Sequence, residues 1–300
     1  MRVGGPLGGQ GIISYHTAPL NVKHIPIHGS IAIYTKIPGA GQEVGTMACI
    51  VWEGNKPLIL SNQHVLYPNS ATVRPKVGDL VYQIGDSAPI GKLYKTIAEP
   101  NPWPAGTKTS GVGTYHDSAL AEPLVDVSDE VNGIGKITGH KDPQVGMNIR
   151  FNGNKSGLRK GKITGVNKNY SNPVAGGKIS IVKNVFTHSA GSDHGDSGSL
   201  IVSDDNKAVG LVYSGTGVGS EGTGCLASVI ASKYGISFAK PSGAPTTSTP
   251  APTPSPTTTP STGDTGAPNL PDFIREKPFI VGVGIITIGL MIVGVAAGQR

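Results

Sequence analysis

The chain has 300 residues, a net charge of +6 and a sequence pI of about 9.2. Its 44 glycines and its low aromatic content of 5% favour short strands and tight turns over long helices. The basic residues are interleaved with Gly and Ser instead of forming a long block, so the composition argues against a nucleic-acid-binding module and indicates a solvated basic face, as at Lys155, Arg159, Lys160 and Lys162.

Residues 1–27 are predicted to be an N-terminal extension, and no secretory signal is expected because the first 30 residues contain no long apolar run. Residues 28–240 are predicted to form an all-β domain, because short apolar segments rich in β-branched side chains alternate with Gly, Asn, Asp and Pro. Strands are expected at 48–52, 58–60, 79–84, 162–166, 179–182, 199–202 and 208–213, and a single helix at about 227–234.

The two cysteines, Cys49 and Cys225, are too few for a disulfide framework and are expected to be buried free thiols. His24 and His28 have helical spacing, but Pro26 argues against a helix and no third ligand follows, so no metal site is expected. The segment 153–157 lacks the full spacing of a phosphate-binding loop and is interpreted as a polar turn.

His64 is the best candidate for a catalytic base among the eight histidines, because it follows the apolar segment 58–60 and precedes Val65 and Leu66. Asp117 stands before Ser118-Ala119-Leu120, which suits a carboxylate at the start of a buried strand. There it could accept the imidazole N–H and stabilise the imidazolium. Asp86, beside Ser87 in a Gly-rich turn, is the alternative to Asp117, whereas Asp126 and Asp129 lie in a polar stretch.

The segment Gly195-Asp196-Ser197-Gly198-Ser199 runs directly into an apolar strand and therefore presents the Ser197 hydroxyl at a sharp bend. The backbone N–H groups of Gly195 and Ser197 are expected to form an oxyanion hole, and Asp196 to fix the turn. Two segments are expected to form the walls of a primary specificity pocket: Ala190, Gly191, Ser192, Asp193 and His194 on one side, and Tyr213, Ser214 and Gly215 on the other.

The C-terminal part changes character abruptly. Residues 241–278 are predicted to be an extended linker, because positions 241–268 are dominated by Pro, Ser and Thr. Residues 279–298 contain no charge and are long enough to cross a bilayer, with Arg275 and Lys277 on one side and Arg300 on the other. The sequence therefore predicts a single-pass membrane segment in contact with lipid, and leaves open on which side of the membrane the domain lies.

With these motifs the chain resembles the chymotrypsin-like (trypsin-fold) serine peptidases, over about residues 28–238. The resemblance is greatest to the prokaryotic, disulfide-poor branch, whose histidine motif is similar to residues 60–66. It implies two packed six-stranded antiparallel β-barrels, with the active site in the cleft between them. It also implies that His64 is the general base, Asp117 its orienting acid and Ser197 the nucleophile, with the N–H groups of Gly195 and Ser197 binding the oxyanion.

Two departures from the family pattern affect what is expected. No Ile-Val-Gly-Gly-like start exists that cleavage could release to pair with Asp196, so zymogen activation of that kind is not expected. The residue six positions before Ser197 is Gly191 rather than Asp, which argues against a pocket for Arg or Lys.

These observations predict a membrane-anchored serine endopeptidase that uses peptide or protein substrates and needs no cofactor. Two alternatives remain open. One is a catalytically silent trypsin-fold module displayed on a cell or virion surface, and the other is an enzyme that hydrolyses esters or processes only its own linker. The sequence does not specify the natural substrate or the oligomeric state.

Overall fold

The computed structural model describes residues 22–36, 44–67, 75–96, 113–114, 116–174, 178–215, 217 and 220–244, with the backbone alone at 113–114 and 171–181. All of them belong to one compact unit. The expected linker 241–278, apart from its first four residues, and the expected membrane segment 279–298 lie outside these ranges. Within them, no helix is both long and apolar enough to span a bilayer.

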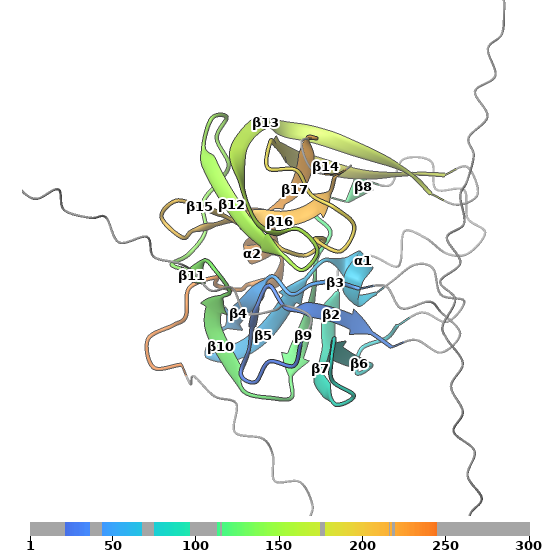
Figure 1. Ribbon diagram of the computed structural model, residues 1–300, viewed down its shortest axis with the longest axis vertical. Helices are drawn as coiled ribbons and strands as arrows, with labels where there is room; N and C mark the ends of the chain where they lie inside the picture. Colours follow the sequence, from blue (N-terminus) through green and yellow to red (C-terminus); the bar gives the residue numbers. More distant parts are fainter. Residues whose placement is uncertain are drawn as a thin grey trace, which may run out of the picture. The chain divides into compact units, whose positions relative to one another are not determined.

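Six strands of the C-terminal half form a closed antiparallel barrel, the upper half of Figure 1, in the order β12-β15-β16-β17-β14-β13 and back to β12. A short strand, β8 (Gly113–Thr114), pairs in parallel with the outer edge of β14. The bounds of the barrel strands are β12 Asn148–Gly153, β13 Gly157–Val174, β14 Lys178–His188, β15 Leu200–Ser203, β16 Ala208–Ser214 and β17 Gly222–Leu226. The expectation of a closed six-stranded barrel is confirmed for this half.

The N-terminal half is a seven-stranded antiparallel sheet in the order β3-β2-β6-β7-β9-β5-β4. Its edge strands β3 and β4 do not pair with each other, so the expectation of a second closed six-stranded barrel is wrong. The chain itself joins the two edges, since only Met47 and Ala48 separate β3 from β4, and their N–H groups donate to the carbonyls of Ile31 (2.9 Å) and Leu60 (2.8 Å). The bounds are β2 Ala32–Thr35, β3 Gly45–Thr46, β4 Cys49–Glu53, β5 Lys56–Ser61, β6 Leu80–Gln83, β7 Pro89–Thr96 and β9 Ala119–Pro123.

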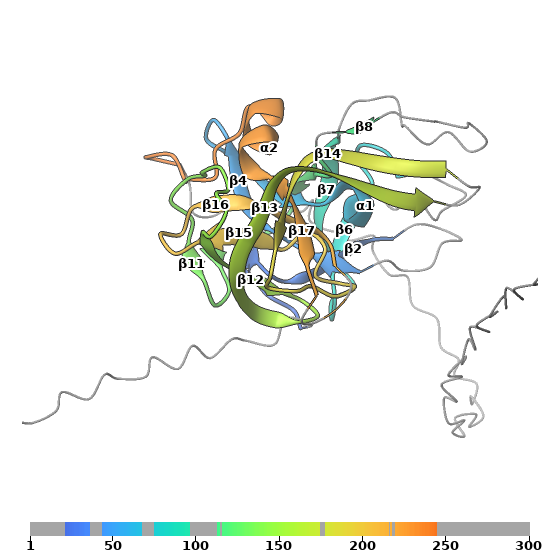
Figure 2. The same cartoon turned by 90° about the horizontal axis from the view of Figure 1, so that it is seen from above.

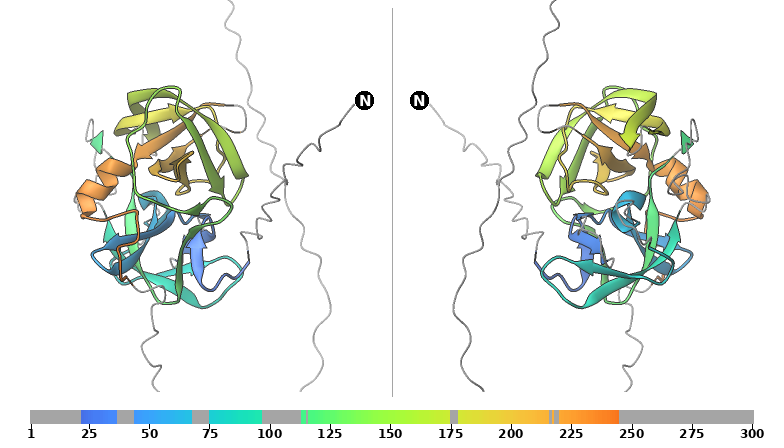
Figure 3. Two further views of the ribbon diagram at one scale, coloured as in Figure 1. Left: turned by 90° about the vertical axis from the view of Figure 1, so that its left-hand side faces the viewer. Right: turned by 90° about the vertical axis from the view of Figure 1, so that its right-hand side faces the viewer.

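A small third sheet joins β1 (Ile27–Gly29), β10 (Val127–Val131) and β11 (Gly135–Lys136), where the chain passes from the first half to the second. The predicted helix is confirmed as α2 (Ala227–Tyr234), which lies at the boundary of the two halves in Figure 3. After α2 the chain returns to the first half, where Ser237 and Trp52 exchange two backbone hydrogen bonds of 2.8 and 2.9 Å.

The two halves share a hydrophobic core. One buried cluster combines Leu58 and Leu60 of β5 with Leu200 and Leu211 of the barrel and Ile230 of α2. Separate clusters fill the first sheet and the barrel interior. Burial of each such side chain contributes about 1.5–3 kcal/mol, so the shared cluster holds the two halves together as one body. The candidate site described below lies at this boundary.

All seven expected segments overlap strands. Five of them differ from the observed bounds by at most two residues, whereas 162–166 and 179–182 are parts of the longer strands β13 and β14. The short helix α1 (Gln63–Leu66), which follows β5 directly, was not predicted, because four residues are too few to show a helical period. The cysteine expectation is confirmed, since Cys49 and Cys225 are both free and buried.

Candidate active site

His64 is positioned by α1. Two of its neighbours on this helix, Val65 and Leu66, are buried in the core of the first half and anchor the helix there. The imidazole Nδ1 is hydrogen-bonded to Oδ2 of Asp117, and the backbone N–H of His64 donates to Oδ1 of the same carboxylate at 3.1 Å. Both carboxylate oxygens therefore hold His64, one through its ring and one through its main chain.

Asp117 stands two residues before β9, where its side chain is only 10% exposed. The side-chain amide of Asn62 donates to its carbonyl oxygen at 2.6 Å. Burial alone would raise the pKa of Asp117, but the neighbouring His64 charge and the hydrogen bonds from His64 outweigh it and hold the pKa below its ordinary value. The acid is therefore ionised near neutral pH, as the stabilisation of an imidazolium requires.

The alternative acid, Asp86, lies elsewhere. Its carboxylate forms an ion pair with Lys23 at 3.0 Å and accepts the N–H of Ala88 at 3.0 Å. Only Asp117 of the two is bonded to His64.

Ser197 lies in a turn that depends on two glycines in the left-handed region, Gly195 with φ +106° and Gly198 with φ +92°. Between them the side chain of Asp196 is fully buried. Its Oδ1 accepts the N–H groups of Lys155 (3.1 Å) and Ser156 (2.8 Å), and its Oδ2 accepts that of Asp193 (2.9 Å). The polar turn 153–157, which joins β12 to β13, thus binds the Asp196 carboxylate. No released N-terminus was expected to pair with Asp196, and the N–H groups of this turn are its partners instead.

Strand β3 connects this turn to the first half. The N–H of Thr46 donates to the carbonyl of Ser197 at 2.8 Å, and its hydroxyl donates to the carbonyl of Gly195 at 2.7 Å. A Cβ on the preceding residue, Gly45, would lie 3.0 Å from the Ser197 carbonyl oxygen and 2.3 Å from Cγ2 of Val65. The backbone of Gly45 therefore lies between Ser197 and Val65, the residue that follows His64.

The structure connects the three predicted residues in different ways. His64 and Asp117 are in direct contact, whereas Ser197 is joined to them, among the described contacts, through Gly45 and Thr46. From the barrel side, the ring of Tyr213 meets the His64 imidazole edge-on, with centroids 6.1 Å apart.

The predicted pocket walls also lie beside this site. On the first wall, Ser192 is buried, Asp193 is half-buried and His194 is exposed. On the second, the hydroxyl of Ser214 is hydrogen-bonded to that of Tyr170 at 2.9 Å, and the Tyr170 and Tyr213 rings pack edge-on at 5.4 Å. The two walls are in contact with each other through Ser192.

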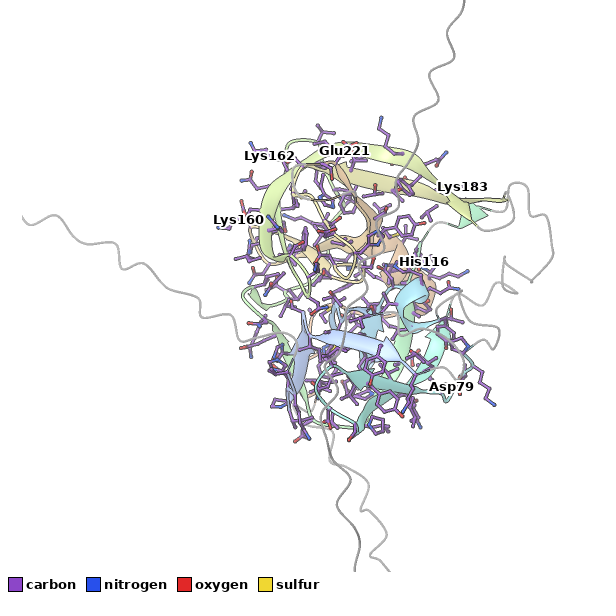
Figure 4. The ribbon with its side chains drawn as sticks, turned by 45° about the vertical axis from the view of Figure 1, so that its right-hand side comes forward. Asp79, His116, Lys160, Lys162, Lys183 and Glu221 are labelled. Carbon is purple, nitrogen blue, oxygen red and sulfur yellow. The ribbon has the colours of Figure 1, made fainter. Side chains whose placement is uncertain are left out.

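Sequence reasoning missed several neighbours of Asp117. The hydroxyl of Tyr234, on α2, donates to the carbonyl of Ser118 at 2.7 Å, and its ring packs edge-on against His116 at 5.7 Å. His116, labelled in Figure 4 near α1, is also hydrogen-bonded to the Ser118 hydroxyl at 2.7 Å. Cys225 on β17 lies against the main chain of Asp117. The contacts made by Tyr234 and Cys225 span more than 100 positions of sequence, so no local pattern predicts them.

Other signals from the sequence lead elsewhere. His24 and His28 are hydrogen-bonded to each other at 3.1 Å, and within the described ranges no group of three or more His, Cys, Asp or Glu could hold a metal ion. Lys160 and Lys162 project outward from the barrel in Figure 4, as expected of a solvated basic face.

Comparisons with known proteins agree at the level of the fold. No family model and no curated protein matches the chain. Among solved structures, the chain is similar to Cellulomonas bogoriensis chymotrypsin at 19% identity, with a TM-score of 0.50 over 72% of this chain and 98% of that one. It is also similar to the α-lytic protease homolog N4 at 17% identity, with a TM-score of 0.51 over 71% of this chain and 98% of that one. At these identities the similarity shows that the chain has the chymotrypsin-like fold.

Proposed function

We propose that this protein is a serine endopeptidase in which Ser197 is the nucleophile, His64 the general base and Asp117 the orienting acid. The observation that carries the proposal is the ionised, buried Asp117, which holds His64 through both carboxylate oxygens beside the braced turn of Ser197. The two solved structures reported above are named as a chymotrypsin and as a protease homologue, which supports the same function.

The chemistry follows from these roles. His64 removes the hydroxyl proton of Ser197 as its oxygen attacks the peptide carbonyl, and Asp117 stabilises the imidazolium without taking the proton. The N–H groups of Gly195 and Ser197 bind the oxyanion, because the left-handed conformation of Gly195 turns the backbone at this point. His64 then protonates the leaving amine, and a water molecule activated by the same imidazole hydrolyses the acyl-enzyme.

The proposal is tested by peptide hydrolysis with the wild type, Ser197→Ala, His64→Ala and the double variant. Because the two groups act as one unit, each single variant should lower kcat by on the order of 10⁴- to 10⁶-fold. The double variant should have about the same kcat as either single variant. Independent, multiplicative losses would contradict a shared mechanism. Wild-type protein that is folded but inactive on all peptides would favour the silent binding module instead.

We further propose that residues 279–298 anchor the enzyme in a membrane, because they form an uncharged stretch long enough to span a hydrocarbon core. The full chain should partition into the membrane fraction and resist carbonate extraction, whereas a chain ending at residue 278 should not. Protease protection in intact cells would then show on which side the domain lies. Equal partitioning of the two chains would overturn the anchor.

The two buried free cysteines support placing the protein near the disulfide-poor branch of this fold. Reducing agent should therefore leave both the stability and the activity unchanged, which urea unfolding with and without dithiothreitol would measure.

A further inference from the structure

We propose that Ser192 closes the primary specificity pocket, so that the enzyme cleaves after Gly or Ala and rejects larger residues on the acyl side of the scissile bond. This inference rests on the proposed peptidase function and names its substrate class. The observation behind it is the lack of space between the two pocket walls, which should receive the side chain of the residue before the scissile bond.

The two walls are joined by two hydrogen bonds and approach each other closely at Gly215. The hydroxyl of Ser192 donates to the carbonyl of Ser214 at 3.3 Å, and the N–H of Gly217 donates to the carbonyl of Ser192 at 2.9 Å. Ser192 and Gly217 thereby form an isolated antiparallel bridge. Between them, a Cβ on Gly215 would lie 2.0 Å from the Ser192 hydroxyl oxygen and 2.7 Å from its carbonyl oxygen.

These distances leave no slot for a side chain. A group inserted between two walls needs a contact distance of about 3.5–4.0 Å on each side. Here the walls are one contact distance apart, so not even a methyl group fits between Gly215 and Ser192. The small residue that is cleaved must therefore lie at the mouth of the closed pocket, where Gly or Ala projects nothing beyond Cβ.

Strand β13 supports both walls from behind. On the first wall, the N–H of Ser189 donates to the carbonyl of Lys162 at 2.9 Å, and a Cβ on Gly161 would lie 2.5 Å from the backbone nitrogen of Ala190. On the second wall, Tyr170 holds the Ser214 hydroxyl. Figure 2 shows β13 running through the barrel half beside β14. Neither wall can move outward without separating from this strand, so the closed arrangement is supported on both sides.

The test uses the full chain in detergent and a set of fluorogenic peptides that differ only in the residue before the cleaved bond: Gly, Ala, Val, Leu, Phe, Lys or Glu. Each excess methylene in a pocket that is too small costs about 10- to 200-fold in kcat/KM. We expect kcat/KM for Ala and Gly to exceed that for Leu, Phe, Lys and Glu by at least about 100-fold. A preference for any of the larger residues would overturn the inference.

Ser192→Gly removes the hydroxymethyl group that fills the pocket, and it should raise kcat/KM for Val at least about tenfold relative to Ala. Ser87→Gly makes the same change in an exposed turn of the first half and should leave the preference unchanged. Labelling of Ser197 by a fluorophosphonate measures whether each variant is folded and competent. A labelled Ser192→Gly protein with the wild-type preference would contradict the role of Ser192.

The two proposals fail in different ways. If Ser197 is labelled but Phe or Lys is preferred, the endopeptidase function stands and the closed pocket is wrong. If Ser197 of the folded wild type is not labelled, both proposals are overturned.

Discussion

The residue on which the geometry of the site depends most is Asp196, a fully buried carboxylate that accepts three backbone N–H groups. In this chain the 153–157 turn supplies two of those donors, so the nucleophile turn is braced without a new N-terminus. The sequence predicted that Asp196 would fix the turn, but it could not identify the partner, because Ser156 is 40 positions away and the donors are main-chain groups that any residue type supplies.

Asp196→Asn replaces one acceptor oxygen by an amide that faces backbone donors. Hydrogen bonds to charged groups contribute about 1.5–3 kcal/mol each, so the free energy of unfolding should fall by about 2 kcal/mol or more. Urea denaturation measures this change. Asp204→Asn alters a side chain that is 72% exposed and should stay within about 0.5 kcal/mol of the wild type. Equal stability of the two variants would contradict the bracing role.

His188 offers a test by pH. Burial lowers its pKa to about 4, against a weaker opposing effect of Glu221, and neither ring nitrogen has a hydrogen-bond partner among the described residues. The unfolded chain takes up a proton below about pH 6.5, whereas the folded protein does so only near pH 4. Stability should therefore fall as the pH drops from 6.5 to 4, by on the order of 3 kcal/mol from this residue.

His188→Leu should remove that part of the acid sensitivity while costing little at pH 7, since no hydrogen bond within the described chain is lost. Urea unfolding at pH 7, 6, 5 and 4.5 measures how steeply the free energy of unfolding changes with pH. His194→Leu changes an exposed histidine and is the matched control. His116, whose pKa burial also lowers to about 4, continues to contribute in both variants. If the free energy of unfolding of His188→Leu depends on pH as steeply as that of the wild type, the role assigned to His188 is wrong.

At the scale of elements, the strand pattern was readable because alternating β-branched residues carry the two-residue period, and α2 was readable because its eight residues span two helical turns. The four-residue α1 and the two-residue β3 were not, although they hold His64 and Thr46. Elements this short acquire their structure from tertiary contacts. Sequence therefore indicates candidate chemical groups better than it predicts the short elements that carry them.

Thr46→Val tests the connection that β3 makes. The hydroxyl donates to the carbonyl of Gly195 and accepts the N–H of Asn154 at 3.0 Å, and both partners would be left unpaired in a buried place. The loss should be about 2 kcal/mol of stability, together with slower fluorophosphonate labelling of Ser197. Thr138→Val, at an exposed position, should change neither quantity. Normal labelling of a destabilised Thr46→Val protein would show that β3 supports the fold but not the nucleophile turn.

At the scale of the whole molecule, the site lies where a closed barrel meets an open sheet, and both halves contribute to it. His64 and Asp117 come from the first half and Ser197 from the second, with β3, the 153–157 turn and α2 crossing between them. The resemblance carried by a few short motifs predicted the two-part architecture. It did not predict that Met47 and Ala48 join the two edges of the first sheet, because that junction depends on which edge carbonyls lie within reach of two N–H groups.

The central claim is that the Ser197 hydroxyl is activated by His64. The most direct measurement is tandem mass spectrometry of the full chain treated with a fluorophosphonate, with Ser197→Ala and His64→Ala treated in parallel. One adduct per chain is expected, located on Ser197, absent from Ser197→Ala and strongly reduced in folded His64→Ala. An adduct on another residue, or equal labelling of the wild type and His64→Ala, would contradict it.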